Sequence, residues 1–285
     1  MKVLITGKNG QLGYELQNTV PQGMQVFAYG SAELDVTDAT AVQNIVEQIK
    51  PDVVINAAAY TAVDKAESDQ DAAYAVNAKG PENLALACKK IGARLIHVST
   101  DFVFDATKNT PYQASDQTKP LGVYGASKLA GELAINNNHP ENSIIIRTSW
   151  VYSSHGNNFV KTMLRLMAEK PELGVVSDQI GSPTWAKGLA HACWAFAQKT
   201  NTGTYHYSDL GIASWYDFAV AIQELGLQKG LLKSAIPVNP IKASAYPTPA
   251  KRPAYSVMNT DATYQTLEQQ GLHWRTALSE MLNEL

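Results

Sequence analysis

The chain has 285 residues, of which 45% are hydrophobic and 17% are charged, a composition typical of a globular protein that can bury a substantial core. Its formal net charge of −3 argues against nucleic acid as a partner, because no basic field is available to attract phosphates. The sequence shows no charged leader followed by an apolar run and no apolar stretch of about 20 residues, so we expect no membrane partner.

Cysteines and histidines are few and scattered. Cys88 and Cys193 each lie in apolar, helix-like surroundings, and we expect both to be buried small hydrophobic side chains in a reducing, cytoplasmic compartment. The six histidines have no spacing typical of metal ligands, so we expect no metal site built from them.

A glycine-rich segment directly follows the first predicted strand, residues 2–6. Gly7, Gly10 and Gly13 are spaced G-x-x-G-x-x-G, and residues 14–17 are compatible with a helix. Strand, glycine loop and helix in this order are typical of a dinucleotide-binding site. Glycines let the backbone approach a diphosphate, and the helix N-terminus offers it unpaired N–H groups.

The elements that follow alternate between strand and helix. Strands are predicted at 25–29, 53–55, 94–98 and 143–147, and helices at 41–49, 81–91 and 124–136. This alternation predicts an α/β fold with a Rossmann-type doubly wound parallel sheet and right-handed crossovers. Because ligands bind at the carboxyl ends of parallel strands, we expect Gly7, Ala57 and Thr100 to meet at one edge of the sheet.

After about residue 150 the alternation becomes less regular. Helices are predicted at 159–169, 184–199, 215–225 and 276–285. Residues 236–253 contain five of the 13 prolines, which predicts a loop held in place by contacts.

Thr100, Tyr124 and Lys128 together form a candidate hydride-transfer site. Lys128 follows Tyr124 by four residues, so both side chains project from one face of a helix. A nearby ammonium favours the phenolate and brings the tyrosine pKa from about 10 towards the working pH, where general acid catalysis is most effective. The Thr100 hydroxyl can hold a carbonyl oxygen against the phenol.

The glycine loop at residue 7, combined with the later Tyr124-x-x-x-Lys128, resembles the extended short-chain dehydrogenase/reductase superfamily. Further segments resemble one of its families, the dTDP-4-dehydrorhamnose reductases: residues 56–67, 99–104, 147–152, 156–159, 178–184 and 246–253. The resemblance implies NADPH-dependent reduction of a dTDP-linked 4-keto sugar at C4 to dTDP-L-rhamnose. It also implies an NAD(P)-binding domain at 1–150 and a smaller, interleaved substrate-binding lobe at 151–285, with a soft boundary between them.

The resemblance also assigns roles to residues. Tyr124 donates the proton, Lys128 holds the nicotinamide ribose and Thr100 orients the carbonyl. Asp101 and Trp150 lie against the sugar, and Arg252 lies near the diphosphate, where a guanidinium can make bidentate bonds. The cofactor-binding set that it implies is Gly7, Gly10, Gln11, Leu12, Gly13, Asp35, Val36, Ala59, Tyr60, Thr61, Val98, Tyr124 and Lys128.

The choice of cofactor depends on the end of the second strand. A carboxylate about 20 residues beyond the glycine loop would favour NAD, but none occurs before Glu33 and Asp35. By resemblance, Asp35 and Val36 line the adenine pocket, which leaves the ribose edge open to a 2′-phosphate with Lys8 as its partner. We expect NADPH, with NADH also accepted.

Three alternatives stay open. Dehydratases of the superfamily resemble this chain but carry an Asp-Glu pair after the threonine, whereas Asp101 is followed here by Phe102, which favours simple reduction. A related eukaryotic protein is a regulatory subunit of a methionine adenosyltransferase, so a catalytically silent NADP-binding subunit is an alternative that the intact Thr100, Tyr124 and Lys128 disfavour. A third is reduction of another nucleotide-linked 4-keto sugar.

Some members of the family are magnesium-bridged dimers that hold the ion through glutamates. Glu15 is present here, but the region expected to supply a second acid contains Lys187, which would repel a divalent cation. We therefore regard magnesium as doubtful, and the oligomeric state, monomer or homodimer, stays open.

Overall fold

A six-stranded parallel sheet forms the centre of the protein. The structure, a computed structural model, describes residues 1–285. The strands are β1 (Lys2–Thr6), β2 (Gln25–Tyr29), β3 (Val53–Asn56), β4 (Arg94–Thr100), β5 (Ser143–Thr148) and β10 (Gly203–His206). Their order is β10-β5-β4-β3-β1-β2, and every neighbouring pair is parallel. This is the predicted Rossmann-type doubly wound sheet, with a switch point between β1 and β3.

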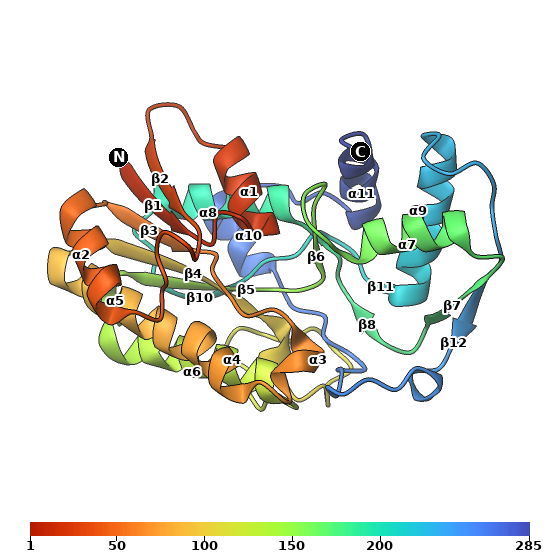
Figure 1. Ribbon diagram of the computed structural model, residues 1–285, viewed down its shortest axis with the longest axis horizontal. Helices are drawn as coiled ribbons and strands as arrows, with labels where there is room; N and C mark the ends of the chain where they lie inside the picture. The colour runs from red at the N-terminus through yellow and green to blue at the C-terminus, as the bar shows by residue number, and fades with distance from the viewer.

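Helices cover both faces of the sheet (Figure 1). One face carries α2 (Ala39–Ile49), α5 (Gly80–Ile91) and α6 (Val123–Asn138), and the other carries α1 (Gln11–Asn18), α8 (Ala186–Ala197) and α10 (Asp261–Leu267). Successive strand residues point to opposite faces, so Leu4 joins the first hydrophobic core and Ile5 joins the second. The continuous apolar runs of the strands follow from this burial on both sides.

A second group of helices lies beside the sheet and surrounds its own core. It contains α7 (Phe159–Glu169), α9 (Trp215–Gln228) and α11 (Trp274–Leu282), and Phe218 and Trp274 pack edge to face at its centre. Short paired strands connect this group: β6 (Val151–Tyr152), β7 (Leu173–Val176), β8 (Ile180–Gly181), β9 (Thr184–Trp185), β11 (Ala213–Ser214) and β12 (Val238–Ile241).

The remaining elements are short. They are α3 (Val63–Ala66), α4 (Gln70–Tyr74), a π-helical turn (Ala75–Lys79) and 3₁₀ turns at Asp101–Val103, Pro140–Asn142 and Ala243–Ala245. No helix combines the length and apolarity that a membrane crossing requires.

Several boundaries differ from the sequence prediction. The helix expected from residue 41 begins at Ala39, because Asp38 caps it by accepting from the N–H groups of Thr40 and Ala41. The helix expected from 184 begins at Ala186, because β9 pairs with β6. The proline-rich loop expected at 236–253 contains β12, whose Pro240 is accommodated in a two-stranded sheet.

Segments from the second half of the chain complete the second core, the one that contains Ile5. β10 extends the central sheet beyond β5, and α8 packs on the same face as α1. The short, partly polar β10 carried no pattern that would have revealed it as a strand.

Candidate active site

The glycine loop lies between β1 and α1 at the switch point of the sheet. Gly7 has φ +76°, in the region that glycine tolerates, and a Cβ at Gly13 would lie 2.1 Å from the Gly7 carbonyl oxygen. Gly10 occupies the N-cap position of α1 and leaves that helix end without a side-chain cap. The loop therefore offers a close-packed backbone cradle with free N–H groups, which suits a diphosphate.

A loop from the second half of the chain closes over this cradle. The His155 ring stacks on Tyr14 with centroids 4.3 Å apart, and its Nε2 lies 3.1 Å from the Asn9 carbonyl oxygen. Asn158 Nδ2 donates to Gln11 Oε1 over 2.9 Å. These contacts attach residues 153–158 to the glycine loop and give the cleft its second wall.

Thr100, Tyr124 and Lys128 line one cavity of about 640 Å³ together with the glycine loop. Thr100 ends β4, and the other two lie one turn apart on α6. Eight more residues of the predicted cofactor and substrate sets line the same cavity, namely Gly10, Gln11, Leu12, Ala59, Thr61, Val98, Asp101 and Trp150. The fold thus brings together predicted residues from the start of α1, the loop after β3, the end of β4, the first turns of α6 and the segment after β5.

Other predicted residues lie outside the cavity wall. Gly7 and Gly13 pack against neighbouring backbone and do not line the cavity. Val36 is buried against Gly80, Asp35 accepts from Thr37 N–H, and the Tyr60 hydroxyl donates to Asp69 over 3.0 Å.

The protonation states of Tyr124 and Lys128 are governed by burial. Burial raises the pKa of Tyr124 to about 12, although contact with the Thr100 hydroxyl lowers it. Burial also lowers the pKa of Lys128 to about 8. The expectation that the Lys128 ammonium lowers the tyrosine pKa is not met, because burial outweighs the effects of neighbouring groups. Lys128 Nζ instead donates to the Val98 carbonyl over 2.7 Å and lies 3.3 Å from His97 Nε2.

A buried ion pair fixes α6 against the sheet. Glu132, two turns beyond Tyr124, accepts from Arg147 Nη2 over 2.7 Å and from Ser99 Oγ over 2.5 Å. Arg147 and Glu132 are almost completely buried. At the other end of α6, Glu67 accepts from the Val123 N–H over 2.9 Å. These contacts hold the tyrosine and lysine at a fixed height above Thr100.

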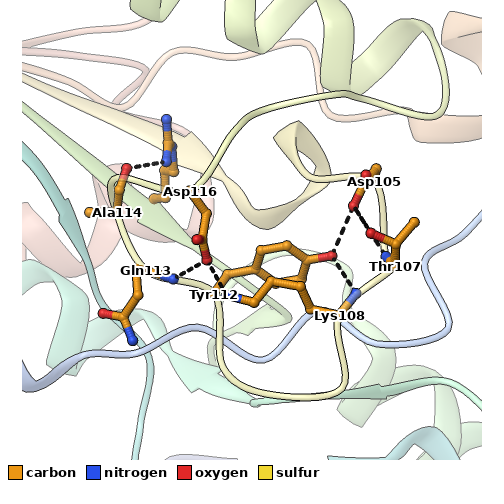
Figure 2. Close-up of polar contacts among 8 residues, drawn as sticks. Asp105, Thr107, Lys108, Tyr112, Gln113, Ala114 and Asp116 are labelled. Carbon is orange, nitrogen blue, oxygen red and sulfur yellow. Dashed lines mark hydrogen bonds and ion pairs between the residues drawn. The ribbon is translucent and has the colours of Figure 1, made fainter.

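The loop between Thr100 and Tyr124 is ordered by polar contacts of its own (Figure 2). The Tyr112 hydroxyl donates to Asp105 and accepts from the Lys108 N–H, and Asp116 accepts from the Gln113 N–H. The Tyr112 backbone also pairs with residues 257–259. The loop therefore connects the strand that carries Thr100 to the segment that carries Arg252.

Asp101 is one of three residues in the cavity wall, with Thr148 and Tyr152, that have a buried oxygen atom without a hydrogen-bond partner. It is 2% exposed, and its Oδ1 accepts from the Thr100 hydroxyl over 3.0 Å. Its Oδ2 makes no hydrogen bond of normal geometry, although the Ser256 hydroxyl lies near enough to lower the pKa of the carboxyl. Burial raises the pKa of this carboxyl to about 6. A buried acceptor without a partner at this position suits a ligand that brings a hydroxyl donor.

A second cavity of about 510 Å³ adjoins the first. The two share the aromatic wall of Phe102, Trp150, Phe159 and Trp215. Trp150 has φ +48° and stacks on Trp215 with ring centroids 3.5 Å apart. Trp215 was not anticipated, because a lone tryptophan at a helix start carries no signal of this role.

Arg252 lines the second cavity and is paired in the structure. Its Nη2 lies 2.6 Å from Asp64 Oδ2, and the two side chains are 26% and 39% exposed. The guanidinium is accessible, so an anionic ligand could compete with Asp64 for it.

The end of β2 differs from the sequence expectation. Glu33 curls back so that its Oε2 accepts from the Gly30 N–H over 2.8 Å, and its other oxygen pairs with Lys8. The Glu33 carboxylate therefore reaches the end of β2, where the sequence predicted no acid beside the adenosine ribose. Lys8, the expected partner of a 2′-phosphate, is paired with this carboxylate. Both side chains are partly exposed, which allows the pair to separate.

The region around Glu15 does not fit a divalent cation. Glu15 is buried and accepts from Ser153 Oγ over 2.5 Å, while the nearby Lys187 ammonium pairs with Glu284 over 2.9 Å. No group of three or more His, Cys, Asp or Glu side chains is arranged to hold a metal ion. A lysine among these carboxylates supplies positive charge where a cation would need oxygen ligands.

Comparison with known proteins gives consistent similarities over the whole chain. The family model described as "RmlD substrate binding domain" matches residues 1–285. A dTDP-4-dehydrorhamnose reductase from Burkholderia thailandensis is 43% identical over 296 positions, which cover 100% of this chain and 99% of that protein.

Solved structures agree. A crystal structure of a dTDP-4-dehydrorhamnose reductase from Clostridium acetobutylicum matches with a TM-score of 0.93 and 41% identity, covering 100% of this chain and 99% of that one. Another from Bacillus anthracis, in complex with NADP, matches with a TM-score of 0.93, 37% identity and the same coverage.

Proposed function

This chain belongs to the family described by the RmlD substrate-binding domain, and on that premise we propose that it is an NADPH-dependent oxidoreductase of dTDP-L-rhamnose synthesis. Its reaction is the reduction of dTDP-4-dehydro-β-L-rhamnose to dTDP-β-L-rhamnose, the last step of that synthesis. The observation that carries the proposal is the single cavity in which Thr100, Tyr124 and Lys128 face the glycine loop.

The chemistry divides between cofactor and protein. NADPH supplies the hydride that forms the new C–H bond at sugar C4, and the C4 oxygen gains a proton as its double bond to carbon is lost. Tyr124 is protonated at neutral pH, because its pKa is about 12, and so holds the proton that this step requires. A positive charge close to the phenol would lower that pKa towards the range in which general acids are most effective. The Thr100 hydroxyl positions the same oxygen, and Lys128 binds the nicotinamide ribose.

The cofactor-binding cleft fits a dinucleotide. Gly7 and Gly13 leave no room for a Cβ, the N-terminus of α1 is uncapped by any side chain, and the cavity is about 640 Å³. A 2′-phosphate would displace Glu33 and pair with Lys8, which favours NADPH once Glu33 has rotated away. NADH is also accepted, because Glu33 can instead receive ribose hydroxyls.

The nucleotide-sugar substrate fits the two adjoining cavities together. In the first cavity the unpartnered Oδ2 of Asp101 suits a sugar hydroxyl, and the Trp150–Trp215 stack, which lines both cavities, supplies a flat apolar wall. Arg252, which lines the second cavity, binds the diphosphate after its ion pair with Asp64 separates. Residues after 150 thus act as the substrate-binding lobe, while most of the cofactor site lies in residues 1–150.

A cytoplasmic location is part of the proposal. It is supported by two free, buried thiols, Cys88 and Cys193, which suit a reducing compartment that also contains NADPH.

The test is a turnover assay with purified protein, NADPH and the 4-keto sugar nucleotide, freshly made by the preceding epimerase. We expect loss of NADPH absorbance and formation of dTDP-L-rhamnose, identified by chromatography and mass spectrometry. Faster reduction of another nucleotide-linked 4-keto sugar would contradict the rhamnose assignment. No consumption of NADPH with any such sugar, although the cofactor binds, would contradict the enzymatic role and favour a regulatory subunit.

A further inference from the structure

A row of buried polar side chains crosses the central strands beneath Lys128. Thr6 on β1, Asn56 on β3 and His97 on β4 are partners in the strand register, so their side chains leave the same face of the sheet. All three are at most 1% exposed. The row ends at Lys128 of α6, whose Nζ lies 3.3 Å from His97 Nε2.

A backbone N–H fixes the direction of the hydrogen bonds in this row. The Ala58 N–H can only donate, and it donates to Asn56 Oδ1 over 3.1 Å, as the Thr6 hydroxyl does over 2.7 Å. The other amide atom of Asn56, Nδ2, therefore faces His97 Nδ1 at 2.9 Å and must donate to it. Because Nδ1 accepts, the neutral His97 ring carries its proton on Nε2.

The His97 proton points at the amino group of Lys128. An ammonium has three donors and no lone pair, so it would oppose this N–H. A neutral amine can accept from His97 and still donate to the Val98 carbonyl, 2.7 Å away. We infer that His97 is a positioning residue, held by Asn56 as the Nε2–H tautomer, that shifts Lys128 away from the ammonium and towards the neutral amine.

The surroundings of Lys128 act in the same direction. Burial lowers the pKa of Lys128 to about 8, and burial also holds the pKa of His97 well below its usual value, so the ring is neutral. The other titratable groups nearby are Tyr124 and Glu132 on α6 and Asp101 after β4, and the Glu132 charge is shared with Arg147 of β5. Glu132 favours the ammonium but is outweighed by burial.

This inference deepens the proposed function, and its kinetic consequence rests on that function. If Lys128 must be an ammonium to bind the ribose, kcat/KM should be constant below the pKa of the free enzyme's lysine. It should fall tenfold per pH unit above that value, near pH 8. A change that makes His97 Nε2 an acceptor would stabilise the ammonium, raise the lysine pKa and move the alkaline limb to higher pH.

Asn56→Asp reverses the direction of the hydrogen bond between residue 56 and His97 with almost no change in the shape of the side chain. Its second carboxylate oxygen accepts from Nδ1–H, which moves the His97 proton from Nε2 to Nδ1 and turns Nε2 towards Lys128 as an acceptor. Thr6→Val is the matched control, because it removes a hydrogen bond to Asn56 without changing the atom that Asn56 presents to His97.

The measurement is the titration of the Lys128 ¹³Cε signal in the cofactor-free protein. We expect a midpoint near 8 in wild type and in Thr6→Val, and one at least one pH unit higher in Asn56→Asp. The alkaline limb of kcat/KM should move by the same amount. A wild-type midpoint in the ordinary lysine range of about 10.4, or equal midpoints in the wild type and Asn56→Asp, would overturn the inference.

The tautomer is also measurable without a folded Asn56 variant. Long-range ¹⁵N–¹H correlation spectra of wild type, with His97 assigned by the signal lost in His97→Gln or by backbone connectivity, should show the Nε2–H form at neutral pH. An Nδ1–H ring or an imidazolium would refute it. Neither NMR measurement requires substrate, so the two proposals can fail separately. If the protein shows the Nε2–H form but reduces no sugar nucleotide, the proposed function is overturned and this inference stands.

Discussion

Replacing Glu132 with Gln should destabilise the protein strongly while leaving its shape almost unchanged. Glu132 is 2% exposed and accepts from Arg147 Nε, Arg147 Nη2 and Ser99 Oγ over 2.5–3.2 Å. The amide keeps one acceptor oxygen but turns an NH₂ group towards the guanidinium. Arg147, 5% exposed, would then carry an uncompensated buried charge.

The expected cost follows from that burial. Breaking a buried ion pair by removing one partner costs about 3–5 kcal/mol, and we expect about 3 kcal/mol because the amide retains part of the hydrogen bonding. With about 2–4 °C lost per kcal/mol in domains slightly smaller than this one, the melting temperature should fall by roughly 6–10 °C. Equilibrium unfolding in urea, followed by circular dichroism, measures the free energy directly.

Two further variants distinguish the stability lost by breaking a buried ion pair from the stability lost by breaking an exposed one. Glu169→Gln removes one partner of the Arg165–Glu169 pair on α7, whose side chains are 60% and 51% exposed. This control should change the stability by less than about 0.5 kcal/mol. Replacing both buried partners, Glu132→Leu with Arg147→Met, should recover most of the lost stability. Equal losses in Glu132→Gln and Glu169→Gln would refute the reasoning from burial.

Three further predictions concern turnover. Tyr124→Phe should lower kcat by about 10²–10⁴-fold while the NADPH dissociation constant, measured by fluorescence titration, stays nearly unchanged; near-wild-type turnover with chemistry rate-limiting would reject Tyr124 as the acid. Glu33→Gln should raise the ratio of kcat/KM for NADPH over NADH about two- to fivefold, because a negative charge is removed beside Lys8. An unchanged ratio would show that Glu33 does not face the 2′-phosphate. Arg252→Gln should raise KM for the sugar nucleotide more than it lowers kcat, with an effect that shrinks as salt increases; a loss confined to kcat would place Arg252 elsewhere.

The parts of the site that were predictable from the sequence are those whose signal is local. Gly7, Gly10 and Gly13 lie within seven residues of one another, and their spacing reports a backbone requirement directly. Tyr124 and Lys128 are one helical turn apart, so their common face follows from helix geometry. The alternation of buried strands and helices likewise predicts the doubly wound sheet, which the structure and its relatives confirm.

The parts that were missed depend on contacts between distant segments. His97 lies in an apolar strand, and only the strand register places it between Asn56 and Lys128. Glu33 reaches Gly30 through a turn that residue spacing does not reveal. The pKa of Tyr124 depends on how deeply the fold buries the phenol, which no spacing of Tyr and Lys can show.

The central claim is that this cavity transfers hydride from NADPH to C4 of a dTDP-linked 4-keto sugar. Its most direct test uses two samples of NADPH, each deuterated on one face of the nicotinamide C4, with purified protein and dTDP-4-dehydro-β-L-rhamnose. We predict that one sample delivers deuterium to C4 of the resulting dTDP-rhamnose, located by NMR, and that the other delivers none. Product that carries no deuterium from either sample, or deuterium at another sugar carbon, would contradict the account.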